Sequence, residues 1–495
     1  MRGGAKGPMK RLVIAGLLAG LGLGVPGGCA VNPATGEQMF SVMSPGEEAR
    51  IGREQHPKLI KAFGGRYDDR ALGDYVTAIG RRLVAVSELA GPGFTFTVLN
   101  SAKVNAFALP GGYVYITRGI VALANSEAEL AGVIAHEIGH VTARHAAQRY
   151  SQRVAAGLGL TLLGVLTGSG DLVRAAGTGA ELYLRSYSRG HELEADTLGI
   201  RYLRRAGYDP NAMAGFLASL GAHAILEARL AGNDTARADG TGLLSTHPRT
   251  IERVRKAAQA SADIAVENPV VGRQAYLGRI DGMLFGDDPG GGYIRGRLFA
   301  HPVLGFRFTV PPGFRLVNTR ARVIAHGPGK SVIIFDQAGK PVRGSLVRYL
   351  RRVWAPEVAL RDVEPLTVNG MGAATGRVRL NTRRGPIDAR LLAIRYDADK
   401  IYRFVFITPT GLTRKLALGL RRTTYSFRRL GVAEARRIRP RRLRIHRVEP
   451  GETVDGLARR MPFAEFRRQR FEVLNALSPG ANLTPGRLVK IIAEG

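Results

Sequence analysis

The stretch from Ser126 to His145 constrains the fold of this chain more than any other. It reads SEAELAGVIAHEIGHVTARH, and its apolar residues recur at the three- and four-residue spacing of a helix with one buried face. Ser126 and Glu129 form a capping-box pattern, which marks the start of a helix. The sequence therefore predicts a helix here, packed against the core of a globular domain.

This predicted helix carries a metal-binding pattern, H-E-x-x-H, at His136, Glu137 and His140. Residues four apart lie on one face of a helix, so both imidazoles can reach one Zn²⁺ ion. Glu137 is about 100° further round the helix and can address a water molecule at the metal. The pattern predicts a zinc site with one ion per chain.

A tetrahedral catalytic zinc site needs a third protein ligand. The single Cys of the chain excludes intramolecular disulfides and a Cys-rich zinc module. The extended motif with a third His fails, because Ala143 and Ala146 stand where Gly and His are required. His145 is one residue out of place, and we interpret it as a surface residue of the same helix.

The segment SRGHELEAD supplies a better third ligand. Glu192 and Asp196 are four apart and share a helix face, whereas Glu194 points away from it. The economical assignment is Glu192 as ligand and Asp196 as the carboxylate that holds a ligand imidazole. We interpret Glu194 as a solvated or ion-paired carboxylate and His191 as a neighbour outside the site.

Four motifs in order resemble a known family. They are NAFALPGGYVYITRG (105–119), HEIGHVTARH (136–145), SRGHELEAD (188–196) and STHP (245–248). Together they resemble the zinc metallopeptidases of the CAAX-prenyl-protease and HtpX type, in the soluble, BepA-like branch of the bacterial envelope. The resemblance implies zinc ligands at His136, His140 and Glu192, a general base at Glu137 and a supporting carboxylate at Asp196.

Two further parts of the site follow from this resemblance. His247 of the H-P pair is expected near the metal, either as a plug that keeps the enzyme latent or as a stabiliser of the oxyanion. The alternating segment Asn105 to Thr117 predicts a strand at the rim of the cleft, with Asn105, Ala106 and Tyr113 as substrate-binding residues. The alternative is an internal strand without substrate contact.

The N-terminus predicts the compartment. The apolar run Leu12 to Val25 follows Lys10 and Arg11 and is too short to span a membrane, which is typical of a signal peptide. Cys29 comes directly after it and is expected to be lipidated, as in bacterial lipoproteins. Ala30 rather than Asp follows the Cys, which favours the outer membrane. We expect a periplasmic, lipid-anchored protein that meets no nucleic acid.

The rest of the chain predicts accessory domains of an α+β multidomain protein. Residues 301–495 hold 39 Lys and Arg against 14 Asp and Glu, so most of the net charge of +32 lies there. Short apolar segments between Pro and Gly turns predict a mixed-β domain. The last fifty residues resemble a LysM domain, a βααβ module that binds glycans. The predicted order is a signal peptide (1–28), a mainly helical metallopeptidase domain with a small edge sheet (29–265), a linker (266–300), a β-rich domain (301–430), a basic linker (431–443) and the LysM-like domain (444–495).

These predictions favour one function over another. The first is a zinc endopeptidase that degrades misfolded or unassembled envelope proteins. The alternative is a binding or chaperone-like envelope factor, tethered to peptidoglycan through the LysM-like domain. The basic C-terminal part is either solvated or held against anionic lipid surfaces.

Overall fold

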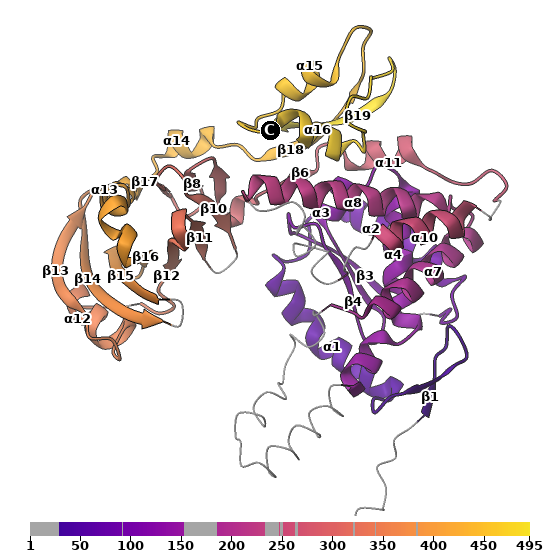
Figure 1. The fold of residues 1–495 in the computed structure, drawn as a ribbon, viewed down its shortest axis with the longest axis horizontal. Coiled ribbons are helices and arrows are strands. Elements are labelled where there is room, and N and C mark those ends of the chain that lie inside the picture. Colours follow the sequence, from indigo (N-terminus) through magenta and orange to yellow (C-terminus); the bar gives the residue numbers. More distant parts are fainter. Residues whose placement is uncertain are drawn as a thin grey trace, which may run out of the picture.

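The structure is a computed structural model of the chain. It describes residues 29–91, 93–152, 186–232, 247, 251–262, 266–319, 322–341, 343–382 and 385–495. The predicted signal peptide lies outside these residues. Within them the fold is mixed α+β, with a helical part followed by a largely β part, as the sequence predicts (Figure 1).

The helical part is built around the helix that carries H-E-x-x-H. Its helices are α1 (Pro45–Ala62), α2 (Arg70–Val84), α3 (Arg118–Leu123), α4 (Glu127–Thr142), α7 (Arg189–Arg205), α8 (Asn211–Leu230) and α10 (Ile251–Ala262). Its strands are β1 (Cys29–Val31), β2 (Gln38–Phe40), β3 (Thr95–Leu99), β4 (Ala106–Leu109) and β5 (Tyr113–Thr117). Helix α4 is buried almost all round, because α2, α7 and α8 pack on it.

A small sheet borders α4. Its strand order is β3-β5-β4, with β3 parallel and β4 antiparallel to β5. Strand β4 has no further partner strand among the described residues, and it packs on α4. The predicted edge sheet is therefore present beside the helix that carries H-E-x-x-H.

Two glycines bring α4 and α7 close together. A Cβ atom at Gly139 would lie 3.1 Å from the carbonyl oxygen of Ala195, and one at Gly199 would lie 3.2 Å from the amide nitrogen of His136. Both distances are tighter than ordinary van der Waals contact. The absence of a side chain at each position therefore lets the two helices approach closely enough to share one site.

The β-rich part forms a separate body, on the left in Figure 1. One antiparallel sheet has the order β10-β11-β12-β16-β15-β14-β13, and a smaller one has the order β17-β9-β8-β7. The elements are β7 (Tyr293–Arg295), β8 (Leu298–His301), β9 (Phe306–Thr309), β10 (Arg315–Asn318), β11 (Val323–His326), β12 (Val332–Gln337), α12 (Leu346–Tyr349), β13 (Arg361–Val368), β14 (Met371–Thr382), β15 (Gly385–Arg395), β16 (Ile401–Pro409), α13 (Thr410–Ser426) and β17 (Arg428–Arg429). Its aromatic core is distinct from the core of the helical part.

The C-terminal residues return to the helical part and form a βααβ unit above α8 in Figure 1. After α14 (Val432–Arg437), its elements are β18 (Arg441–Arg447), α15 (Val454–Arg459), α16 (Arg467–Leu474) and β19 (Leu488–Glu494). The order strand, helix, helix, strand is the one predicted for this segment, and β18 and β19 pair antiparallel. Its apolar residues join the same core cluster as α4 and α8.

The segment 266–300 differs from the expected linker. It contains α11 (Arg273–Ile280) and β6 (Leu284–Phe285), and the side chains of Tyr276, Leu277 and Ile280 are fully buried. Strand β6 pairs with β18, so this segment joins the βααβ unit to the helical part. The Gly- and Pro-rich run that suggested a linker covers only the turn between β6 and β7.

A buried lysine fixes the βααβ unit on the helical part. Lys490 of β19 has no exposed surface, and its Nζ donates to the carbonyl oxygens of Ala122 (2.8 Å), Leu123 (3.1 Å) and Ala124 (2.8 Å). These carbonyls lie at the C-terminal end of α3, where the helix itself offers no N–H groups to bond them. Burial lowers the pKa of Lys490, and Glu129 in the first turn of α4 opposes this shift.

None of the helices in the described ranges combines the length and the apolar character that a bilayer crossing requires.

We predict that Lys490→Ala destabilises both α3 and β19, the two elements that this contact joins. The substitution leaves three buried carbonyl oxygens without their hydrogen-bond donor. It should lower the free energy of local unfolding of α3 and β19 by about 3 kcal/mol. Hydrogen exchange followed by mass spectrometry should show faster exchange in α3 and β19. Lys400→Ala is the matched control, because Lys400 lies in a half-exposed pair with Asp397. Equal exchange in the two variants would contradict the prediction.

Candidate metal centre

The two helices of the site begin at well-formed caps. The Ser126 hydroxyl accepts a hydrogen bond from the amide of Glu129 at the start of α4, as the capping pattern predicts. The Glu129 carboxylate accepts a hydrogen bond from the amide of Asn125, whereas a regular capping box would use the amide of Ser126. Ser188 caps α7 in the same way, through the amide of His191. These caps fix where each helix starts and therefore which residues face the partner helix.

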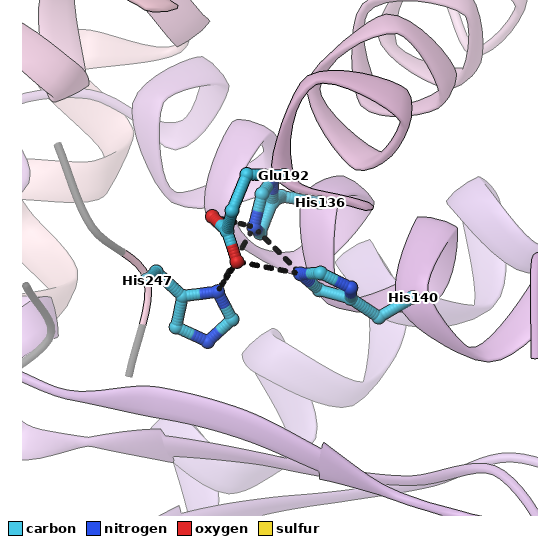
Figure 2. A group of neighbouring side chains, drawn as sticks. All are labelled: His136, His140, Glu192 and His247. Carbon is cyan, nitrogen blue, oxygen red and sulfur yellow. Dashed lines mark hydrogen bonds and ion pairs between the residues drawn. The ribbon is translucent and has the colours of Figure 1, made fainter. Parts of the chain in front are cut away.

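Four buried side chains gather between these helices. His136, His140, Glu192 and His247 each offer one ligand atom, and these atoms all lie within 4.8 Å of one another. Figure 2 shows the two α4 imidazoles and the Glu192 carboxylate pointing toward a common centre, with His247 opposite. The sequence predicted the first three as metal ligands and placed His247 near them, and the structure brings all four together.

The polar contacts at Nδ1 of both imidazoles turn their Nε2 atoms toward the centre of the cluster. Nδ1 of His136 lies 2.9 Å from Asp196, and Nδ1 of His140 lies 2.7 Å from Nδ1 of His145. The two Nε2 atoms then face each other at 3.0 Å and lie 3.6 Å from the Glu192 carboxylate. Two lone pairs and a carboxylate that converge in a buried site are the donor set of a divalent cation such as zinc.

Glu137 lies beside this cluster rather than in it. Its side chain is 1% exposed, and its Oε1 is 3.6 Å from Nε2 of His247. Its Oε2 has no hydrogen-bond partner in the part of the chain that the structure describes. Burial raises the pKa of Glu137, whereas His247 and His136 act in the opposite direction. A buried carboxylate with an open oxygen next to a metal site is suited to taking a proton.

Arg253 of α10 completes the site, and our sequence reasoning missed it. Its guanidinium binds both oxygens of Asp196 (2.7 and 2.8 Å) and one oxygen of Glu192 (2.7 Å). Burial alone would raise the pKa of Asp196, but the bonds from Arg253 and His136 lower it to about 2. The signal that could have found Arg253 is the need of buried carboxylates for a cation.

The prediction for His145 is wrong. Helix α4 ends at Thr142, and the side chain of His145 is fully buried rather than on the surface of the same helix. Its Nε2 lies 3.0 Å from Oε2 of Glu194, so this carboxylate has a hydrogen-bond partner on the side of the helix away from the metal cluster. The bond from His145 lowers the pKa of Glu194. His191 stacks on His145 at 4.3 Å between ring centroids and lies outside the metal cluster.

Tyr187 is a further residue that the sequence did not indicate. Its ring stacks on His140 with a centroid distance of 4.0 Å, and Arg149 lies over it at 4.2 Å. Burial raises the pKa of Tyr187 to about 12. The ring therefore stays neutral and restricts the orientation of the His140 imidazole.

The expected substrate residues lie in the edge sheet. Asn105 and Ala106 are buried at the start of β4, and Thr117 holds this end through bonds with the Asn105 backbone. Tyr113 is at the other end of the sheet, where its ring lies 4.7 Å from His56 of α1. The substrate role of these residues stays a prediction, as does the lipidation of Cys29, whose backbone begins β1.

The part of the chain that carries this site is similar to known peptidases. Residues 71–261 match the model of "Peptidase family M48". The chain is 32% identical over 254 residues to the beta-barrel assembly-enhancing protease of Yersinia pestis, covering 50% of each chain. It is 31% identical over 226 residues to the protein of that name from Escherichia coli, covering 43% of this chain and 46% of the relative. It is 28% identical over 229 residues to the mitochondrial metalloendopeptidase OMA1 of Schizosaccharomyces pombe, covering 45% and 64%.

The region that matches the M48 model contains His136, His140 and Glu192, three of the four side chains that could hold a metal ion. The chain spans about half the length of the bacterial relatives it matches. The β-rich part and the βααβ unit lie outside the matched region.

We predict that Arg253→Met lowers the free energy of unfolding by about 3–5 kcal/mol, because it leaves two buried carboxylates without their cation. The measurement is chemical denaturation with a metal chelator present, so that zinc binding adds nothing to the stability. Arg255→Met is the matched control, since Arg255 is exposed on the same helix and should change the stability by less than about 0.5 kcal/mol. A similar loss in both variants would count against the ion-pair argument.

Proposed function

From the M48 match over residues 71–261 we propose that this chain is a zinc-dependent endopeptidase of the bacterial envelope. The observation that carries the proposal is the convergence of His136, His140 and Glu192, with Glu137 buried at its side. The same four residues are the ligands and the base that the motif resemblance implies. A protein that only binds its clients has no need of a buried base next to a metal site.

The chemistry assigns a role to each residue. One zinc ion held by His136, His140 and Glu192 would supply a Lewis acid that polarises the scissile carbonyl and makes water acidic enough to react at neutral pH. Glu137 accepts the proton of the attacking water and delivers it to the leaving amine. Asp196 fixes the ring of His136, and Arg253 holds Asp196 and Glu192 in place.

Strand β4 is the element we propose for substrate binding. It is an edge strand among the described residues, and it packs on α4. An extended peptide added to such an edge is bound through its main chain, which gives loose side-chain preference. This suits unfolded or unassembled envelope proteins as substrates, with Asn105 and Ala106 at the end of the strand that Thr117 anchors. The names of the bacterial relatives point to the same compartment.

His247 gives the site a latent state in this proposal. Its Nδ1 lies 2.9 Å from Glu192 and 3.3 Å from Nε2 of His136, within the ligand cluster. A fourth side chain in this place occupies the position that a catalytic zinc site keeps open for water. Displacement of His247 would therefore switch the enzyme on.

We also propose a location in the cell and roles for the parts of the chain outside the metal centre. We expect Cys29 to anchor the protein to the periplasmic face of the outer membrane through acyl chains, and the basic C-terminal part to lie against anionic lipid surfaces. The βααβ unit is the part we expect to bind peptidoglycan as a LysM-like module. This unit shares a core with the helical part, above α8 in Figure 1. The alternative function is a binding or chaperone-like envelope factor that is tethered to peptidoglycan through this unit.

We predict that Glu137→Gln keeps one zinc per chain and lowers casein cleavage by about 10²- to 10⁴-fold, because only the base is lost. Metal content and cleavage rate are measured on the same preparation. Glu192→Ala should lose zinc and activity together, and Glu54→Gln on the exposed side of α1 should change neither. Zinc-loaded wild type without cleavage of casein would favour the binding factor.

We predict that His247→Ala raises the rate of casein cleavage by about tenfold, which corresponds to about 1.4 kcal/mol of contacts that hold the latent state. Initial rates at equal zinc content are the measurement. His326→Ala, an exposed histidine of the β-rich part, is the control. A fall in rate would contradict latency and would assign His247 to stabilisation of the oxyanion instead.

A further inference from the structure

A row of buried and partly buried polar side chains contacts Nδ1 of His140, the second metal ligand of α4. Nδ1 of His140 contacts Nδ1 of His145 at 2.7 Å, Nε2 of His145 contacts Oε2 of Glu194 at 3.0 Å, and Nδ2 of Asn32 donates to Oε1 of Glu194 at 2.9 Å. His140 and His145 are almost wholly buried. The row runs from the metal cluster through α7 to the N-terminal hairpin.

We infer that Asn32, Glu194 and His145 form a positioning relay that fixes the tautomer and the orientation of the zinc ligand His140. The inference rests on the proposed zinc site and adds residues that act behind it.

The protons in this row can be assigned in one consistent way. His140 offers Nε2 to the metal, so its Nδ1 carries the hydrogen and donates to Nδ1 of His145. His145 then carries its own hydrogen on Nε2, where it donates to the Glu194 carboxylate. Asn32 donates to the second oxygen of that carboxylate. Each atom in the row has one role, and loss of His145 leaves the buried Nδ1 of His140 without its acceptor.

The two ligand histidines are therefore supported differently. His136 is held directly by Asp196, the usual carboxylate partner of a metal-bound imidazole. His140 reaches its carboxylate only through a second imidazole. This arrangement requires His145 to lie under His140, although α4 has already ended at Thr142.

The N-terminal segment holds His145 in that place. Arg144 has a φ of 54°, a left-handed conformation that is strained for a residue with a side chain. Its guanidinium donates to Glu48 (2.7 Å) and to the carbonyl of Met43 (2.8 Å). Asn32, Met43 and Glu48 all precede the residues matched by the family model. The relay thus depends on a part of this chain that the M48 match does not cover.

The test measures zinc affinity rather than activity. Competition with a chromophoric chelator should show that His145→Leu binds zinc about 10- to 100-fold more weakly than wild type. His145→Asn should recover much of this loss, because the Asn side-chain oxygen can accept from Nδ1 of His140. Asn32→Ala should weaken binding by less, since it removes the outermost link. Absorption spectra of the Co²⁺-substituted variants report whether the ligand geometry at the metal has changed.

His191→Leu is the matched control. His191 stacks on His145 but contributes no nitrogen to the row, so its loss removes packing and leaves the relay intact. Its zinc affinity should stay within about threefold of wild type. Equal affinity and equal Co²⁺ spectra for wild type and His145→Leu would overturn the inference while the proposed function stands. A wild-type chain that binds no zinc would overturn the proposed function itself.

Discussion

The close packing of α4 on α7 is the constraint on which the site depends. Glycines at 139 and 199 leave the two backbones near enough that a Cβ atom at either position would press on the partner helix. At this separation the imidazoles of one helix and the carboxylates of the other meet in a buried space without any loop between them. The geometry of the metal centre is therefore set by main-chain packing before any metal binds.

The charges of the buried side chains favour a cation in this site. Glu137, Glu192 and Asp196 are buried together, and Arg253 is the guanidinium that pairs with two of them. With all three ionised, the cluster keeps an excess of negative charge, and burial raises the pKa of Glu137, which has no such partner. A divalent cation balances that excess better than a second arginine could, because it also uses the imidazole lone pairs.

The sequence predicted what depends on local periodicity. The spacing of H-E-x-x-H and of Glu192 with Asp196 places side chains on known faces of two helices, and the caps fix the helix starts. It could not predict contacts made by tertiary packing. Arg253 reaches the site only because α10 packs on α7 and α8. The prediction for His145 failed because the helix ends at Thr142 and the chain turns at Arg144. This turn is held by a contact of Arg144 with the backbone of Met43, which is far away in the sequence. The expected linker failed for a similar reason, since composition shows the turn at 286–292 but not the partners of α11 and β6.

Both ends of α4 are braced by parts of the chain outside the family match. At its C-terminal end the N-terminal segment holds Arg144 and reaches His140 through Glu194 and His145. At its N-terminal end Lys490 binds the last carbonyls of α3, three residues before α4 begins, and lies near Glu129. The helical part of this chain is thus discontinuous in sequence: the β-rich part is inserted between β6 and β18, two strands that pair with each other. A structural change in the N-terminal segment or in the βααβ unit would therefore act on the helix that carries His136, Glu137 and His140.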